Sequence, residues 1–145
     1  MRLVLQRVAS ASVSVDGEVV GRINRGILAL VAAGHDDDER VSAKAANKIA
    51  GLRIFADDQG RMNRSVQEVG GEVLVVSQFT LLGDTSKGRR PSFVSSAPAT
   101  VAEPLVTGLA DELAGMGLRV AQGRFGADMQ VALINDGPVT LVVDL

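Results

Sequence analysis

Uncharged polar side chains follow one another at the end of the strongest strand pattern in the chain, at Ser77, Gln78 and Thr80, with Phe79 between them. Two hydroxyls and an amide can donate and accept hydrogen bonds without carrying charge, which suits a pocket for a polar substrate. An ordinary strand end has the same pattern, so spacing alone leaves the two interpretations equally open. If the strand continues, its alternation predicts Ser77 and Phe79 on one face and Gln78 and Thr80 on the other.

A second stretch, Asn135-Asp136-Gly137-Pro138, lies between two apolar segments. Turn-forming residues in this order favour a tight turn. A Gly–Pro bond is also one of the few peptide bonds that adopt the cis form at a small cost, about 0.5–1 kcal/mol. A cis bond between Gly137 and Pro138 would aim the neighbouring carbonyl groups in a way that side chains cannot imitate, so this stretch is a candidate recognition element.

Three cationic side chains, Lys87, Arg89 and Arg90, gather in a short segment of a protein whose net charge is −2. A solvated loop is one interpretation. The alternative is a local contact with phosphate groups, which would attract an anionic partner in a salt-dependent way. The weak total charge argues against a broad nucleic-acid surface and for contact with a small part of an RNA.

The residue types of the commonest catalytic centres are scarce. The chain has no cysteine, which excludes a disulfide scaffold, a thiolate zinc site, an iron–sulfur cluster and a cysteine nucleophile. Its one histidine, His35, lies in an acidic segment, where a solvated loop residue is favoured over a Ser-His-Asp triad. The residues Asp36, Asp37 and Asp38 lack the spacing of a calcium loop, so helix capping is favoured for them. A single histidine also argues against a histidine-based metal site.

Length and composition indicate one domain, residues 1–145. A chain of 145 residues with 46% apolar and 22% charged residues is typical of a folded domain rather than a disordered segment. No segment approaches the ~20 apolar residues of a membrane span, and the charged N-terminus is unlike a signal peptide, so a cytoplasmic protein is expected. Aromatic residues make up only 3%, which argues against a protein that stacks bases on many rings.

The order of the expected elements predicts an α+β fold. Two stripes of apolar residues four apart predict helices, the first ending at Gly51 and the second running from about Pro98 to Gly115. Many strands with only two main helices favour a curved, largely antiparallel, barrel-like sheet that the helices partly cover. Strands are expected at residues 3–8, 11–15, 18–23, 27–33, 52–55, 72–82, 118–120, 129–134 and 139–143.

Several element ends carry their own signals. Asp16-Gly17 predicts a hairpin turn. The second helix has two alternative starts, Pro98 as its first residue or a capping box formed by Thr100 and Glu103. The segment 123–126 lacks the strand-before, helix-after context of a phosphate loop and is expected to be an ordinary loop. The last strand would leave a free sheet edge, which predicts self-association.

These stretches, in this order, resemble the D-aminoacyl-tRNA deacylase family, the bacterial-type enzymes often called D-Tyr-tRNA deacylases. The resemblance covers essentially the whole chain, and the Ser-Gln-Phe-Thr and Gly-Pro-Val-Thr stretches together are highly specific. The matching segments are residues 1–8, 11–13, 16–17, 47–49, 52–55, 77–81, 87–93, 123–129 and 135–140.

The resemblance implies a homodimeric hydrolase with active sites at the subunit interface and no metal or organic cofactor. Such enzymes cleave the ester between a D-amino acid and the 3′-terminal adenosine of a tRNA, and they act on some mischarged glycyl-tRNA. It implies that Gly137 and Pro138 are a cis pair that reaches into the partner's pocket as a chirality filter. The other site residues implied are Ser77, Gln78, Phe79 and Thr80 lining the pocket, Arg7 bracing the Gly–Pro loop, and Met129 in the pocket wall.

The physical logic of this function agrees with the residues present. Mirror-image substrates carry the same groups, so a rigid wall of main-chain carbonyls can accept the α-ammonium and leave no space for an L side chain. Glycine has no side chain and escapes that exclusion. Because the ribose 2′-hydroxyl lies close to the ester carbonyl, the substrate can assist its own hydrolysis. Thr80 is therefore expected to orient the ester or a water rather than to form an acyl-enzyme, with nearby main-chain N–H groups stabilising the oxyanion.

Two functions of other classes stay open on the sequence. One is a noncatalytic module that grips the end of a tRNA, which the scarcity of aromatics and the net negative charge disfavour. The other is a stereospecific hydrolase of small amino-acid esters or amides, which the basic segment at Lys87–Arg90 disfavours mildly.

Overall fold

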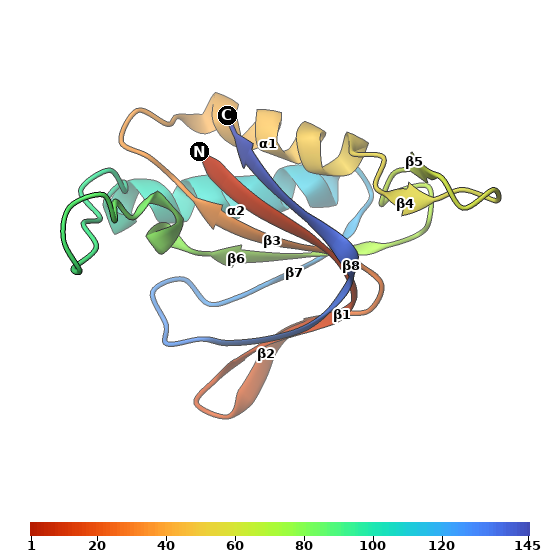
Figure 1. Cartoon of the computed structure of the whole chain (residues 1–145), viewed down its shortest axis with the longest axis horizontal. Helices are drawn as coiled ribbons and strands as arrows, with labels where there is room; N and C mark the ends of the chain where they lie inside the picture. The colour runs from red at the N-terminus through yellow and green to blue at the C-terminus, as the bar shows by residue number, and fades with distance from the viewer.

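The computed structural model describes residues 1–145 and contains a six-stranded sheet with two helices packed on one face (Figure 1). The strand order is β2-β1-β3-β6-β7, and β8 pairs with β1 as well. The single domain with a curved sheet and two main helices agrees with the prediction. The elements are β1 (Arg2–Val15), β2 (Glu18–Ile23), β3 (Gly26–Ala32), α1 (Glu39–Gly51), β4 (Phe55–Ala56), β5 (Met62–Arg64), β6 (Glu72–Ser77), the 3₁₀ helix η1 (Phe79–Leu82), α2 (Ala99–Gly115), β7 (Arg119–Gln122) and β8 (Gln130–Asp144).

The sheet is nearly closed into a barrel because β1 bends. Its first half, Arg2–Val8, pairs with β3 and its second half, Ala11–Val15, pairs with β2, while β8 follows both halves. Figure 1 shows β1 and β8 curving together. The bend brings β2 back toward β7, and a Cβ on Gly21 would collide with the carbonyl oxygen of Gln122. Only glycine permits this approach of the two backbones.

The sheet is largely antiparallel, as predicted, and it also has a parallel part that the sequence did not indicate. β1 is antiparallel to β2, β3 and β8, but β6 runs parallel to both β3 and β7. Parallel neighbours need long crossover connections, and the helices lie in these: α1 follows β3 and α2 follows β6. The carboxyl ends of β3 and β6 therefore lie side by side at one edge.

Two apolar cores lie on opposite faces of the sheet. The larger fills the space between the sheet and the two helices, and the smaller lies inside the curve of the barrel. Ser42 joins the helices, because its buried hydroxyl donates a hydrogen bond of 2.8 Å to the carbonyl oxygen of Leu105. The smaller core consists of Val8, Ala11, Val13, Ile23, Leu28, Leu74 and Val76.

The helix ends agree with the sequence signals in part. Asp38 caps α1, where its carboxylate accepts from the Arg40 amide at 3.0 Å, as the acidic segment predicted. Gly51 is the last residue of α1. α2 begins directly after Pro98 with no side-chain cap, so the alternative capping box of Thr100 with Glu103 is wrong.

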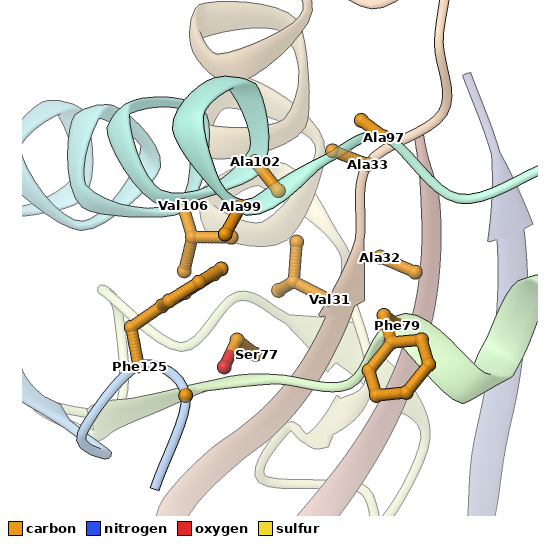
Figure 2. Close-up of a pocket in the computed structure, with 11 residues that line it drawn as sticks. Val31, Ala32, Ala33, Ser77, Phe79, Ala97, Ala99, Ala102, Val106 and Phe125 are labelled. Carbon is orange, nitrogen blue, oxygen red and sulfur yellow. The ribbon is translucent and has the colours of Figure 1, made fainter.

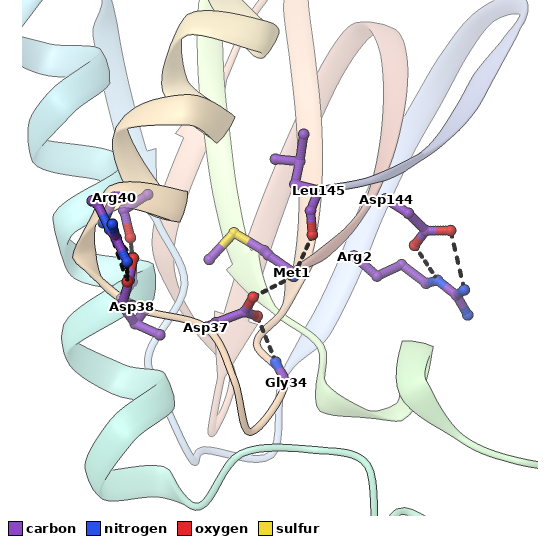
Figure 3. Close-up of polar contacts among 10 residues, drawn as sticks. Met1, Arg2, Gly34, Asp37, Asp38, Arg40, Asp144 and Leu145 are labelled. Atoms are coloured by element: carbon purple, nitrogen blue, oxygen red, sulfur yellow. Dashed lines mark hydrogen bonds and ion pairs between the residues drawn. The ribbon is translucent and has the colours of Figure 1, made fainter.

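Asp37 does not cap α1 as Asp38 does but binds the N-terminus of the chain. Its carboxylate forms an ion pair of 2.7 Å with the amino group of Met1 and accepts from the Gly34 amide at 2.7 Å (Figure 3). The amide of Leu145 donates to the Met1 carbonyl at 3.0 Å. These contacts join β1, the end of β8 and the loop that follows β3.

Strand continuity was predicted wrongly at two places. The segments expected as separate strands at 3–8 and 11–15 form the single strand β1, and those at 129–134 and 139–143 form the single strand β8. The tight turn expected at Asn135–Pro138 is absent, and the Gly137–Pro138 bond is cis. The chain stays paired with β1 here: Asn135 pairs with Val8 and Thr140 with Gln6, so residues 136–139 bulge out opposite a single residue of β1.

Two shorter predictions also need correction. The strand expected over 72–82 ends at Ser77, and the chain turns into η1. The short strand expected at 52–55 is displaced to Phe55–Ala56, paired with β5. The Asp16–Gly17 hairpin is confirmed, with both residues at positive φ. Neither main helix has the length and apolar character needed to cross a membrane.

Candidate active site

An apolar pocket of about 330 Å³ opens at the edge where the parallel strands β3 and β6 end. In sheets with parallel strands, ligands bind outside the carboxyl ends of those strands. The first turns of α2 and the segment 123–126 close the other sides (Figure 2). The lining residues are Val31, Ala32, Ala33, Ser77, Phe79, Ala97, Ala99, Ala102, Val106, Phe125 and Gly126.

Ser77 is placed at the pocket by strand pairing. It is the last residue of β6 and lies opposite Val31 of β3, so its hydroxyl is among the few polar groups of the lining. The Gln78 amide still donates to the carbonyl of Val31 at 2.7 Å, and the chain then leaves the sheet. The residues that follow belong to a 3₁₀ turn, not to a strand.

Ser77 and Phe79 share one side and Gln78 and Thr80 another, as predicted, but the 3₁₀ turn and not a continuing strand produces this arrangement. Ser77 and Phe79 both line the pocket. The side-chain amide of Gln78 donates to the Thr80 hydroxyl at 2.5 Å, and neither of these two residues belongs to the lining. The alternation of a strand no longer applies beyond Ser77. The hydroxyl of Ser96 donates to the Phe79 carbonyl at 3.0 Å and fixes the turn. Thr80 is exposed and follows Phe79 of the pocket lining, and its hydroxyl accepts from the uncharged Gln78 side chain.

The bulge at Gly137–Pro138 is exposed and held from behind by Arg7. The Arg7 Nε donates to the Asp136 carbonyl at 3.0 Å and lies 3.1 Å from its carboxylate. Another guanidinium nitrogen donates to the Ile54 carbonyl at 2.5 Å. The Asn135 amide donates to the carbonyls of Arg7 at 2.9 Å and Val139 at 3.1 Å. These bonds define the path of the backbone across the bulge.

The bulge and the pocket do not meet within one chain. Arg7 pairs with Ile27 on β3, whereas Ser77 lies opposite Val31. Four residues along β3 correspond to roughly 13 Å, and three strand spacings between β8 and β6 add about 14 Å across the sheet. Gly137 therefore cannot contact a substrate seated at Ser77 of the same chain.

Met129 lies outside the pocket of its own chain. It is half-buried and packs against the smaller core. A Cβ on Gly123 would come within 2.8 Å of its sulfur, so Met129 supports the segment that carries Phe125.

The basic segment forms an exposed loop beyond η1. Asp84 and Ser92 exchange two backbone hydrogen bonds of 2.7 and 2.9 Å that close its base. Lys87, Arg89 and Arg90 are exposed and take part in none of the ion pairs of the structure. Hydrogen bonds from Ser86 hold the pKa of Asp84 below its ordinary value, so this carboxylate stays charged at neutral pH.

Sequence reasoning missed the pocket wall opposite Ser77. Phe125 was expected to belong to an ordinary loop, but it lines the pocket together with Ala99, Ala102 and Val106 of α2. Small residues at the start of α2, where a core-facing helix commonly carries larger ones, are the signal that could have indicated a hollow.

The histidine and the acidic segment stay outside the site. The His35 Nε2 lies 2.7 Å from the Val94 carbonyl oxygen, in the loop region rather than in the pocket. No three His, Asp or Glu side chains gather closely enough to hold a metal ion.

A family profile described as D-Tyr-tRNA(Tyr) deacylase matches residues 4–144. The chain belongs to this family. The resemblance predicted from the sequence is therefore confirmed, and membership makes the protein an ester hydrolase.

Similar proteins cover the whole chain. A D-aminoacyl-tRNA deacylase of Roseiflexus castenholzii is 58% identical over 144 residues, covering 99% of this chain and 92% of the relative. One of Rhodopirellula baltica is 53% identical over 145 residues and covers 100% of both.

Two solved structures have the same fold. A protein titled c-Myc DNA Unwinding Element Binding Protein superposes with a TM-score of 0.93 at 38% identity, covering 100% of this chain and 99% of the other. A probable eukaryotic D-amino acid tRNA deacylase superposes with a TM-score of 0.86 at 20% identity, covering 99% of this chain and 98% of that one.

Proposed function

We propose that this protein hydrolyses the ester between a D-amino acid and the 3′-terminal adenosine of a tRNA, and that it also acts on some mischarged glycyl-tRNA. The observation that carries the proposal is the pocket: an apolar hollow of about 330 Å³ with uncharged polar groups at its mouth, in a chain of the deacylase family. Such a hollow accepts a flat, largely apolar group such as a nucleobase. The ester would then lie at the mouth.

The chemistry at the mouth needs no charged side chain. With the base of the adenosine in the pocket, the ester carbonyl lies near Ser77, Thr80 and the main chain at Phe79. Water attacks the carbonyl carbon, the bond to the ribose 3′-oxygen breaks, and that oxygen takes up a proton as the tRNA leaves. The neighbouring 2′-hydroxyl assists, while Thr80, held by Gln78 at 2.5 Å, orients the ester or the water.

Selection between mirror images belongs, in this proposal, to Gly137 and Pro138 of a second copy of the chain. The bulge is exposed and too far from its own pocket, so it can reach a substrate only across an interface. β8 also carries exposed apolar side chains, with Ile134 63% and Val142 65% exposed. A homodimer would cover them and bring each bulge to the partner's pocket.

The filter works by exclusion. Main-chain carbonyls at the bulge accept the α-ammonium of the substrate, and the adjacent backbone occupies the space that an L side chain would need. A D side chain points away from this wall. Glycine presents no side chain to either direction, so glycyl esters are cleaved as well.

The cations Lys87, Arg89 and Arg90 contribute attraction for phosphate groups. They are exposed and free of carboxylate partners. The tRNA-end contact would be local and salt-dependent.

One assay separates this function from the two alternatives. Catalytic amounts of the protein are incubated with D-Tyr-tRNA, L-Tyr-tRNA and D-tyrosine ethyl ester. We expect turnover of D-Tyr-tRNA alone. Binding of the tRNA without turnover would favour a noncatalytic module, and cleavage of the ethyl ester at a comparable rate would favour a hydrolase of small esters.

A second measurement tests the role of Thr80. A quenched reaction is analysed by mass spectrometry, and no adduct on the protein is expected. An aminoacyl group on Thr80 would overturn the orienting role.

A further inference from the structure

Two of the four phenylalanine rings lie on the surface beside the pocket, in a protein poor in aromatic residues. Phe79 is 55% exposed and Phe93 is 37% exposed. Their ring centroids are 5.2 Å apart and their planes meet at 70°. We refer to this pair as the aromatic step. Exposed rings of this kind are common where a protein receives another flat group.

The aromatic step is held in place by its surroundings. The Phe93 ring lies against the backbone of Gly83, where an added Cβ would come within 2.8 Å of the ring carbon Cε1. The Ser96 hydroxyl donates to the Phe79 carbonyl at 3.0 Å. Because the rings are positioned in advance, a ligand that stacks on them does not have to order them.

The aromatic step continues the pocket outward. Phe79 belongs to the pocket lining and is also more than half exposed, so one ring borders both the hollow and the open surface (Figure 2). The Phe93 ring is in edge contact with Phe79 and does not belong to the pocket lining. A chain of nucleotides that leaves the pocket over Phe79 meets Phe93 next.

Positive charge flanks the aromatic step. Lys87, Arg89 and Arg90 occupy the loop that connects the two rings in sequence, and its base is closed between Asp84 and Ser92. Asp84 is the one carboxylate between the two phenylalanines. Rings beside unpaired cations are the combination by which proteins bind single-stranded nucleic acid, the rings stacking on bases and the cations contacting phosphates.

We propose that the aromatic step binds the unpaired nucleotide that precedes the terminal adenosine of the tRNA, with its base stacked on Phe93 and its phosphates facing the basic loop. The inference rests on the proposed function and specifies how the same site recognises RNA beyond the ester. Any base can stack on the aromatic step, so this contact does not distinguish one tRNA from another. It does distinguish the end of a tRNA from a free aminoacyl ester, which has no such nucleotide.

The test uses a matched pair of variants, Phe93→Leu and Phe93→Tyr. Leucine keeps apolar packing against Gly83 but has no ring face, whereas tyrosine keeps the ring. Each is assayed on D-Tyr-tRNA and on the same tRNA with an abasic penultimate nucleotide. Phe93→Leu should raise KM for the intact tRNA about tenfold with kcat unchanged, and Phe93→Tyr should match the wild type.

The abasic substrate completes a double cycle. The KM of the wild type should rise on the abasic tRNA about as much as the KM of Phe93→Leu rises on intact tRNA. The KM of Phe93→Leu should rise no further on the abasic tRNA. If Phe93→Leu is impaired relative to the wild type by the same factor on both tRNAs, or is also impaired on 3′-O-D-tyrosyl adenosine, Phe93 only supports the fold. Either result would overturn the inference. No loss on intact tRNA would overturn it too.

The outcomes for the two proposals differ. If the wild type cleaves no D-Tyr-tRNA, the proposed function itself fails. If the wild type cleaves it and Phe93→Leu is equally active, only the stacking role fails. Thermal unfolding of both variants verifies that they are folded.

Discussion

The pocket at Ser77 and the bulge at Gly137 are opposite in form. The pocket is a hollow whose walls come from β3, β6, α2 and the segment 123–126 of one chain. The bulge is an exposed projection that a hydrogen bond from Arg7 holds in place. One chain supplies all the walls of the pocket, whereas the exposed bulge can contact a substrate only if that substrate is bound to another molecule. This difference in form supports the proposal that two copies of the chain make up one site.

The largest effect is expected from Gly137→Ala. An added Cβ would come within 2.9 Å of the Asn135 side-chain oxygen, so either the bulge moves or the Asn135 side chain gives up the two hydrogen bonds that define the path of the bulge. A displacement of about 1 Å at a substrate-positioning group lowers activity by about 100-fold. Ser77→Ala, which removes one hydroxyl from the mouth, should cost about tenfold or less. Deacylation of D-Tyr-tRNA is measured for both, and normal activity of Gly137→Ala would contradict the filter role.

A mixed dimer tests whether the pocket and the bulge of one site come from two chains. Ser77→Trp fills the pocket mouth and Gly137→Ala alters the bulge, so each variant alone should be inactive. If the site joins two chains, one site of each heterodimer carries neither change, and a one-to-one mixture should recover about a quarter of wild-type activity. Steady-state rates are measured after co-refolding. A mixture no more active than its components would show that both elements act within one chain.

Arg7→Lys should have an intermediate effect on the bulge. Lysine keeps the charge but cannot bond the Asp136 and Ile54 carbonyls together, as the Arg7 guanidinium does. We expect a loss of about tenfold in kcat/KM for D-Tyr-tRNA and a modest decrease in Tm. The exposed Arg22→Lys serves as the control. A Tm decrease with full activity would limit Arg7 to a structural role.

On the pocket side, neutralising the basic loop should change substrate affinity and not the chemical step. Lys87→Gln with Arg89→Gln should raise KM for D-Tyr-tRNA by a few-fold and reduce its dependence on salt, because two phosphate contacts are lost. The rate on 3′-O-D-tyrosyl adenosine should stay the same. KM values at two salt concentrations decide the matter, and an unchanged salt slope would exclude phosphate contact by this loop.

The smallest effect concerns stability at the far end of β8. The hydrogen bond from Arg2 holds the pKa of Asp144 below its ordinary value, so the folded state favours the charged carboxylate. This contribution is present above the unfolded-state pKa, near 3.9, and is lost as the pH falls through the folded value. Asp144→Asn should therefore destabilise slightly at about pH 7 and less at about pH 3, because the contribution decreases as the pH falls below the unfolded-state pKa. Urea unfolding at both pH values measures this, and an equal change at both would contradict it.

The predictable parts of the fold are those that depend on neighbours in sequence. The Asp16–Gly17 hairpin, the Asp38 cap and the extents of the two helices follow from local backbone preferences and apolar spacing. The tight turn at Asn135–Pro138 was wrong because β1 pairs on both sides of the bulge, and this long-range pairing outweighs the local turn preference. The pocket wall at Phe125 was missed for a similar reason, since it comes from an element distant in sequence.

The amino-acid order alone established the family, the two chemically distinctive stretches and the scarcity of ordinary catalytic groups, because these are properties of residue type and spacing. Only the folded chain revealed that Ser77 ends a parallel strand at a hollow, and that Gly137 lies on a projection some distance away. Residue types specify which hydrogen bonds and charges are available. Strand pairing and helix packing decide which of them share one space.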